Sequence, residues 1–190
     1  MNIQLLMTGN ELMSGDIIDS NSAMIADQLQ PLGITVTRRV TVGDNLQQLV
    51  DEIQYISQSA DLLLVNGGLG PTTDDMTAQA LALATGTELV ENAEALTHLT
   101  QWCEQRNAQL NEANLKQTIL PEGCEIVPNP RGTAVGFQMS LNDCLVVCTP
   151  GVPSELKVML QQTIIPALQN QVNPDDACVR DRFHTFGLGE

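Results

Sequence analysis

The sequence contains few basic residues, few aromatic residues and no long hydrophobic run. Eight Lys and Arg residues stand against 23 Asp and Glu residues in this 190-residue chain, which gives a formal net charge of −15 at pH 7. A surface this acidic cannot neutralise a nucleic-acid backbone over a broad contact, and an anionic membrane surface repels it. We therefore expect partners that are neither nucleic acid nor membrane.

Signals for membrane insertion, secretion and zinc binding are also missing. The apolar runs are too short to span a bilayer, and the N-terminal segment MNIQLL lacks the basic region of a signal peptide. The five cysteines are odd in number and form no Cys-x-x-Cys pair, and only two histidines accompany them. This combination argues against a zinc site and against a disulfide framework. It predicts a cytoplasmic protein with reduced cysteines.

The residues that are present indicate an α/β fold. Hydrophobic residues make up 43% of the chain and aromatic residues only 3%, so we expect an aliphatic core. Short β-type runs alternate with amphipathic segments, which predicts a mostly parallel sheet covered by helices on both faces. Strands are expected at 2–8, 34–42, 61–66, 125–128, 135–139, 144–148 and 178–186, and helices at about 19–32, 45–57, 74–85, 93–106, 111–120 and 153–169.

The domain boundary is expected near residue 170. Residues 1–170 form one compact domain in this interpretation. Residues 171–190 begin with a polar linker and end in TFGLGE, which favours the start of a following domain.

Ligands of parallel α/β sheets bind outside the carboxyl ends of the strands. This rule selects the loops at 8–21, 66–77 and 148–157 as the candidate site.

The loop NGGLGPTTDDMT at 66–77 is the first candidate. Asn66 ends a strand and is expected to contact the ligand. Gly67, Gly68 and Gly70 would let the backbone approach a phosphate closely before the next helix begins. The loop lacks the Gly-Lys-Ser/Thr of a Walker A sequence and the third glycine of the dinucleotide fingerprint. Asp74 and Asp75 follow, as site carboxylates or, in the alternative interpretation, as a helix N-cap.

The loop after the first strand adds further oxygen ligands. Thr8 and Gly9 would contact the ligand, and Glu11 and Asp19 would join Asp74 and Asp75 around a divalent metal ion. Asp19 is equally explained as a helix N-cap.

The third loop, TPGVPSELK, supplies a rigid turn and a cation. Pro150, Gly151 and Pro153 would fix the turn against the ligand, and Lys157 is one of only two lysines in the chain. We expect Lys157 to contact phosphate, with Arg131 as a second candidate. The alternative is that Lys157 lies on an ordinary first helical turn.

Five segments in this order resemble the N-terminal domain of the competence/damage-inducible protein CinA family, which is part of the molybdopterin-binding (MoaB/MogA-like) superfamily. They are TGNELMSGDIIDSNS, VGDN, NGGLGPTTDDMT, NPRGTAVGF and TPGVPSELKVM. The resemblance covers residues 2 to about 170. It implies a three-layer α/β/α sandwich and a ligand site built from the GGLG loop, Asp75 and the PGVP loop. It also implies a homodimer or larger homo-oligomer.

The resemblance further implies a metal-dependent ADP-ribose pyrophosphatase. The leading hypothesis is hydrolysis of ADP-ribose to AMP and ribose 5-phosphate, with Asp75, Asp74 and Lys157 as catalytic residues. Mg²⁺ is the expected metal ion, with K⁺ as the other candidate. The family's nicotinamide-nucleotide deamidase resides in a separate C-terminal domain that nothing here matches, so that activity is not predicted.

Two alternatives stay open. One is a non-catalytic domain that binds molybdopterin or a nucleotide, and the other is a purely structural front domain of a longer protein. The CinA-type sequence Thr-Gly-Asp-Glu reads Thr-Gly-Asn-Glu here, so Asn10 removes a charge beside the expected metal site. That change favours the binding interpretation if the missing Asp is a metal ligand.

Overall fold

A computed structural model of the protein describes residues 1–171 and contains a six-stranded sheet of order β2-β1-β3-β8-β7-β6. Four neighbouring strands run parallel, and β7 and β6 add to one side in antiparallel fashion. The sheet is therefore mostly parallel, as predicted. The strands are β1 (Ile3–Thr8), β2 (Val36–Val42), β3 (Leu62–Asn66), β6 (Glu125–Val127), β7 (Gly136–Leu141) and β8 (Cys144–Thr149).

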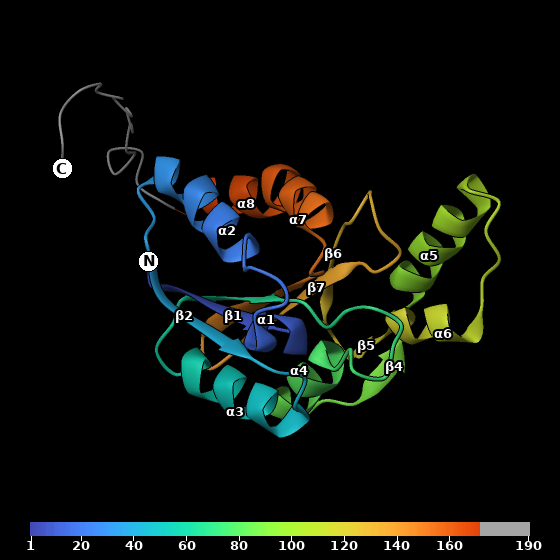
Figure 1. Ribbon diagram of the computed structural model, residues 1–190, viewed down its shortest axis with the longest axis horizontal. Helices are drawn as coiled ribbons and strands as arrows, with labels where there is room; N and C mark the ends of the chain where they lie inside the picture. The colour runs from blue at the N-terminus through green and yellow to red at the C-terminus, as the bar shows by residue number, and fades with distance from the viewer. Residues whose placement is uncertain (172–190) are drawn as a thin grey trace.

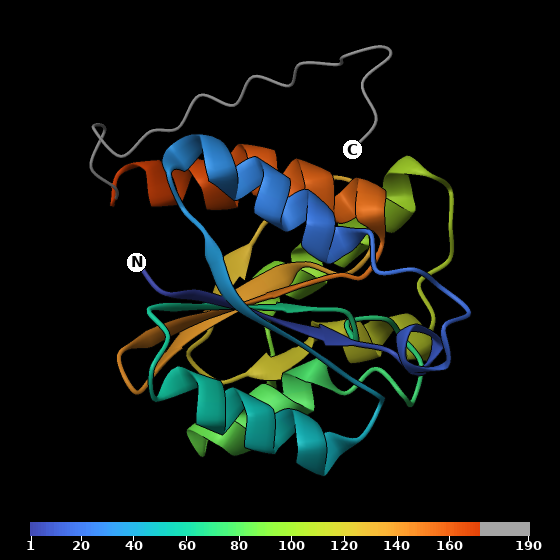
Figure 2. The same cartoon turned by 60° about the vertical axis from the view of Figure 1, so that its left-hand side comes forward.

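Helices cover both faces of the sheet and make three layers (Figures 1 and 2). One face carries α2, α7 and α8, and the other carries α3 and α4. The bounds are α2 (Asn21–Leu29), α3 (Leu46–Ser57), α4 (Thr77–Thr85), α7 (Pro153–Met159) and α8 (Ile165–Gln169). The three-layer α/β/α expectation is confirmed.

The core forms two apolar layers because successive strand residues point to opposite faces. Leu5 and Leu64 pack in the layer under α2 and α7, whereas Leu6 and Val65 pack in the layer under α3 and α4. All four side chains are fully buried. Strands that are apolar on both faces are typical of a central parallel sheet.

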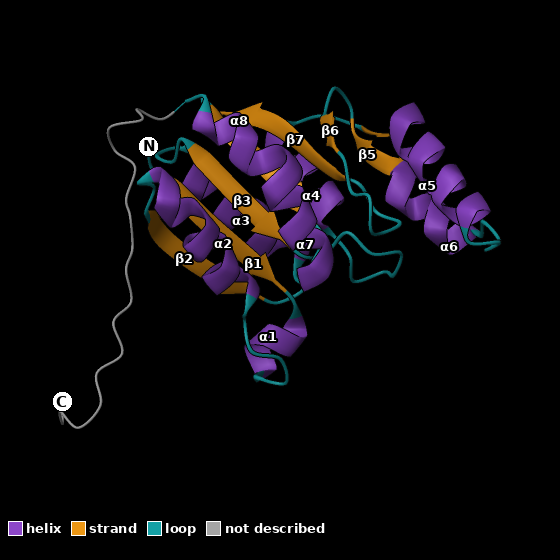
Figure 3. Ribbon diagram, turned by 90° about the horizontal axis from the view of Figure 1, so that it is seen from above, coloured by secondary structure: helices purple, strands orange, loops and turns teal. Residues whose placement is uncertain are grey.

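A smaller unit lies to one side of the sheet. It contains β4 (Leu89–Glu91), α5 (Ala93–Gln105), α6 (Glu112–Leu115) and β5 (Ile119–Pro121), and β4 pairs with β5 in antiparallel fashion. In Figure 3, α1 (Asn10–Ser14) projects beyond the ends of the strands, while α5 and α6 lie at the side.

Several element boundaries differ from the prediction. The segment at 111–120 is not one helix: α6 is followed by a 3-10 turn (Lys116–Thr118), and Ile119 already belongs to β5. The expected helix at 153–169 contains a π-helical turn (Leu160–Ile164), directly before α8. Pro166 has no N–H to donate within that helix, which explains the irregular turn. The predicted strand at 178–186 lies outside the described residues.

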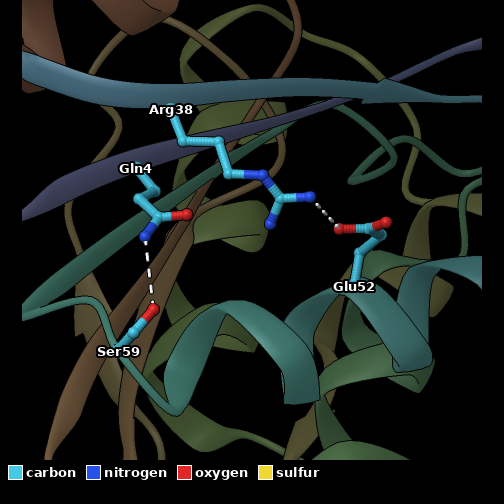
Figure 4. A network of polar contacts seen from close by, with 4 residues as sticks. All are labelled: Gln4, Arg38, Glu52 and Ser59. Carbon is cyan, nitrogen blue, oxygen red and sulfur yellow. Dashed lines mark hydrogen bonds and ion pairs between the residues drawn. The ribbon is translucent and has the colours of Figure 1, made fainter.

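The edge strand β2 is tied to both helical layers. Arg38 reaches Glu52 on α3 with an N–O distance of 3.3 Å, and Arg39 donates to Ser22 on α2 over 2.7 Å. Figure 4 shows Arg38 between Glu52 and Gln4, on the same face of the sheet as Ser59. The two arginines therefore point to opposite faces of the sheet, as neighbouring residues of a strand do.

None of the helices in residues 1–171 is long and apolar enough to cross a membrane. Within the same part of the chain, Cys103, Cys124, Cys144 and Cys148 are free thiols. Burial raises the pKa of Cys148 well above its ordinary value, so this thiol stays protonated.

Candidate functional site

A cavity of about 450 Å³ lies at the carboxyl ends of β1, β3 and β8. The three strands end in register, because Met7 is paired with Asn66 and Asn66 with Thr149. Loops from all three strands meet there, as the sequence predicts. The lining residues are Thr8, Gly9, Glu11, Asp44, Gly67, Gly68, Leu69, Gly70, Pro71, Asp74, Asp75, Gln117, Thr133, Ala134, Pro150, Gly151, Val152 and Glu155.

Asn66 holds the loops together from below the cavity. Its Nδ2 donates to the Pro150 carbonyl over 2.7 Å and to Thr149 Oγ1 over 3.1 Å. Its Oδ1 accepts from Asn21 Nδ2 over 2.8 Å, and that nitrogen also donates to the Gly151 carbonyl. The side chain of Asn66 is therefore used within the protein and does not line the cavity.

The glycine loop depends on backbone angles that favour glycine. Gly67 and Gly68 have φ angles of +110° and +65°. Thr77 Oγ1 donates to the Gly67 carbonyl over 2.8 Å, and the Thr77 N–H donates to the Gly68 carbonyl over 3.2 Å. The Gly67 N–H donates to the Thr149 carbonyl over 2.9 Å, so it is not one of the groups that would cradle a phosphate.

The acidic end of this loop is held by hydrogen bonds. Asp75 Oδ2 accepts from the backbone N–H of Thr72 over 2.9 Å and from its hydroxyl over 2.6 Å. Lys116 donates its Nζ to the carbonyl oxygen of Asp75 over 2.7 Å and to that of Thr72. The lysine at the loop is thus Lys116, whose role we had not predicted.

Asp74 is an exposed residue of the same loop. Hydrogen bonding by Thr72, with a smaller contribution from the charge of Lys116, lowers the pKa of Asp74 below its ordinary value. Asp74 therefore carries its negative charge at neutral pH.

The loop after β1 is closed by a reciprocal pair of hydrogen bonds. Asn10 Oδ1 accepts from the Asp44 N–H over 3.1 Å, and Asp44 Oδ2 accepts from the Asn10 N–H over 3.0 Å. Thr8 Oγ1 lies 3.4 Å from Asp44 Oδ1. Asn10 therefore stabilises the loop and does not line the cavity. Asp44 contributes its carboxylate to the cavity wall.

The structure brings most of the predicted residues to the cavity but not all. Those that line it are Thr8, Gly9, Glu11, Gly67, Gly68, Gly70, Asp74, Asp75, Pro150 and Gly151. Four others do not line it, in addition to Asn66: Asp19, Arg131, Pro153 and Lys157.

Each of these four has a structural explanation. Asp19 accepts from the Ser22 N–H over 2.9 Å, so its carboxylate binds the first turn of α2, directly before the N-cap residue Ser20. Lys157 is exposed on α7, whereas the residue before it, Leu156, is fully buried. Pro153 begins the same helix, and Arg131 is exposed in the 129–134 loop.

The expected metal ligands do not form a cluster. Within residues 1–171, no three His, Cys, Asp or Glu side chains are grouped so that they could hold a metal ion. Asp75 already accepts two hydrogen bonds from Thr72, and Asp19 lies outside the cavity wall. A metal site built from protein groups alone does not fit these residues.

Eight of the 18 residues of the cavity wall are not among the predicted ones, and three of these carry a carboxylate or an amide: Asp44, Gln117 and Glu155. Asp44 precedes α3 but does not cap it: Asn45 is the N-cap, since its Oδ1 accepts from Gln48 N over 3.0 Å. Glu155 lies in the first turn of α7, and its Oε2 accepts from Asn129 Nδ2 over 2.7 Å. No sequence pattern marks Gln117 as a site residue, because only the tertiary fold brings it to the glycine loop.

The family assignment follows from the chain as a whole. A family model described as "Probable molybdopterin binding domain" matches residues 4–170, almost the whole described region. The chain belongs to this family. The expected resemblance to molybdopterin-binding domains is thereby confirmed.

Relatives with a similar sequence are CinA-like. A CinA-like protein of Colwellia psychrerythraea is 55% identical over 188 residues, which covers 99% of this chain and 44% of that protein. A Shewanella oneidensis protein named nicotinamide-nucleotide amidohydrolase PncC is 44% identical over 190 residues, which covers 100% of this chain and 45% of that protein. The chain therefore spans less than half the length of these two relatives.

Solved structures support the same fold. A CinA protein of unknown function from Thermoplasma acidophilum superposes with a TM-score of 0.79 at 30% identity, covering 87% of this chain and 96% of that one. MoaB from Thermus thermophilus gives a TM-score of 0.60 at 18% identity, with coverage of 88% and 91%. The second match shows the fold alone.

These comparisons correct the expected activity. The relatives are named CinA-like protein or, in Shewanella oneidensis, for an amidohydrolase that acts on a nicotinamide nucleotide, and these names do not refer to ADP-ribose. The prediction that this chain is an ADP-ribose-pyrophosphatase-like hydrolase was wrong. It came from the resemblance alone, and Lys157, the cation expected to assist hydrolysis, does not line the cavity.

Proposed function

We propose that this chain is a non-catalytic domain that binds a phosphorylated heterocycle of the molybdopterin or nucleotide class. The observation that carries the proposal is the 450 Å³ cavity at the ends of three adjacent parallel strands. Its volume is within the range of about 300–1,000 Å³ that is typical of small-molecule sites. The name of the family supports the pterin class, and the name of the Shewanella oneidensis relative supports the nucleotide class.

Backbone forms much of the wall that would contact a phosphate. A Cβ atom added at Gly151 would lie 3.5 Å from the Cα of Gly67, so the two loops approach each other closely. A Cβ atom added at Gly70 would lie 2.5 Å from Asp75 Oδ2. A larger residue at either position would narrow the cavity, so glycine keeps the space open for a ligand.

The charge of the cavity sets a condition on binding. Five carboxylate side chains line it, and the lining residues in the described part of the chain include no Lys, Arg or His. A phosphate would be repelled by this surface unless a cation came with it. We propose that Mg²⁺ enters with the phosphate, because Mg²⁺ commonly binds through phosphate oxygens, water and only one or two carboxylates. Glu11 and Asp74 are the exposed carboxylates that could contact it.

Thermal melts with defined probes test this function. AMP, nicotinamide mononucleotide and a pterin phosphate are each added with Mg²⁺, with K⁺ or with a chelator. We expect at least one probe to raise the melting temperature in a concentration-dependent way with Mg²⁺, because a ligand that binds only the native state stabilises it. Chromatography should recover that probe unchanged.

A matched pair of variants tests the role of the cation. Glu11→Gln removes a carboxylate from the cavity, whereas Glu104→Gln removes one from the exposed surface of α5. We expect the first to weaken the Mg²⁺ dependence of the thermal shift and the second to leave it unchanged. If none of the probes shifts the melt at millimolar concentration, the binding function is wrong; conversion of a probe would refute its non-catalytic character.

A further inference from the structure

Gln117 lies between the cavity and a smaller apolar recess beside it. The recess has a volume of about 100 Å³ and shares Gly68, Leu69, Gly70, Asp75 and Gln117 with the main cavity. Its other walls include Gln79 and Lys116 and are otherwise apolar, with Leu120, Val135 and Phe137 among them. A space of this size can take one edge of a planar ring, while the rest of the ligand occupies the main cavity.

The amide of Gln117 has a defined orientation. Its Nε2 donates to the Leu69 carbonyl oxygen over 3.2 Å, and a carbonyl oxygen can face only the nitrogen of the amide. The residue is 8% exposed, and Oε1 is buried without a hydrogen-bond partner in the described part of the chain. Buried acceptors are nearly always paired, since an unpaired one destabilises the protein.

The position of Gln117 relative to the glycine loop is also fixed. Lys116, the preceding residue, binds the carbonyl oxygens of Thr72 and Asp75, and Thr118 Oγ1 donates to the Leu115 carbonyl over 2.8 Å. Lys116 and the Gln117 amide thus join the 3-10 turn to the glycine loop, and the Thr118 hydrogen bond closes the turn itself. An acceptor held this rigidly can discriminate between ligands by hydrogen bonding.

We propose that Gln117 determines which ring the site accepts. Resting on the proposed binding function, the inference is that Gln117 Oε1 accepts a hydrogen bond from an amino, carboxamide or ring N–H group of the ligand. The ring edge would enter the apolar recess and the phosphate would stay in the main cavity. A ring that presents only acceptors at this edge would leave Oε1 unpaired or repelled and would bind more weakly.

Two ligand pairs measure this selectivity by calorimetry with Mg²⁺. AMP is compared with purine riboside 5′-monophosphate, which lacks the amino group. Nicotinamide mononucleotide is compared with nicotinic acid mononucleotide, in which a carboxylate replaces the donor. We expect the donor-bearing member of at least one pair to bind wild-type protein about tenfold more tightly, in the range of one buried hydrogen bond.

Variants then assign the selectivity to the amide. Gln117→Met keeps the length of the side chain but removes the acceptor, and we expect the two members of the pair to bind it equally. Gln48→Met makes the same change at an exposed position of α3 and should keep the tenfold preference. Should Gln117→Met fail to fold, Gln117→Asn, which withdraws the amide by one methylene, takes its place with the same expectation.

The outcomes separate this inference from the binding function. Equal binding of both members of each pair to wild-type protein overturns the inference and leaves the function standing. The same holds if Gln117→Met keeps the preference. If only the pterin phosphate binds, about tenfold weaker binding to Gln117→Met supports the inference, because a pterin carries amino and ring N–H donors, and unchanged binding overturns it. Failure of all probes to bind overturns both.

Discussion

Gly68 and Gly86 have nearly the same backbone angle in different surroundings. Their φ angles are +65° and +70°, values that residues with a side chain rarely adopt. A Cβ atom at Gly68 would lie 2.5 Å from Thr77 Oγ1, whereas one at Gly86 would meet nothing within 4 Å. The two glycines therefore separate backbone strain from steric conflict at the site.

We expect Gly68→Ala to be more harmful than Gly86→Ala. The control should lose about 1–2 kcal/mol of unfolding free energy from the left-handed backbone alone. Gly68→Ala should lose more, because it also displaces Thr77, and it should weaken binding of the nucleotide or pterin probe. Urea denaturation and calorimetry measure the two effects, and equal losses in both variants would show that contact with Thr77 is unimportant.

Residue roles at the site depended on neighbours that are distant in the sequence. Of the two lysines, Lys157 attracted attention because it follows the PGVP loop, but Lys116 is the one that binds the glycine loop. Residue type and loop membership found Asp74, Asp75 and Glu11. They could not find Asp44, Gln117 or Glu155, whose approach to the cavity depends on how separate loops pack.

Helix α3 shows how a local signal decides an element. Asn45 adopts an extended backbone (φ −128°, ψ 112°), and its side chain accepts from the N–H of Gln48. Asp44, the residue before Asn45, instead forms two hydrogen bonds with Asn10. Both residue types cap helices well, so the sequence alone could not choose between them.

Substitution at the cap should cost stability without affecting the cavity. We expect Asn45→Ala to lower the unfolding free energy by about 1 kcal/mol, because it leaves the Gln48 N–H without its partner. Asn45→Asp keeps an acceptor and should stay close to the wild type. Urea denaturation of both variants provides the measurement, and an unchanged midpoint for Asn45→Ala would contradict the assignment of the cap.

At the scale of the whole molecule, the two core layers are completed within the described residues. The layer under α2 and α7 ends with Leu168, which is 3% exposed on α8. A chain that stops after Gln171 keeps all the strands and helices that form these layers.

We therefore expect a chain of residues 1–171 to fold by itself. Its thermal unfolding should stay cooperative, with a melting temperature within about 3 °C of that of the 190-residue chain, which corresponds to roughly 1 kcal/mol or less. Calorimetry of the two chains side by side tests the domain boundary predicted near residue 170. A broad transition, or a much lower melting temperature, would move that boundary toward the C-terminus.

The association of this chain into a homodimer or larger homo-oligomer stays a prediction.

The sequence by itself determined the class of fold and the region of the site. Alternation of apolar strands with amphipathic helices is a local property, so β1, β3 and β8 and the helices between them were predictable. The rule that ligands bind at the carboxyl ends of parallel strands then selected the three loops that meet at the cavity.

Only the tertiary structure decided which side chains the cavity contains and how they are charged. The side chain of Asn66 lies below the loops because its amide bridges β3 to the turn after β8, and Asp19 binds the first turn of α2. Gln117 reached the site from a separate 3-10 turn, 47 to 49 positions along the chain from Gly68 and Gly70. Contacts of this kind depend on the packing of distant segments, which residue spacing does not encode.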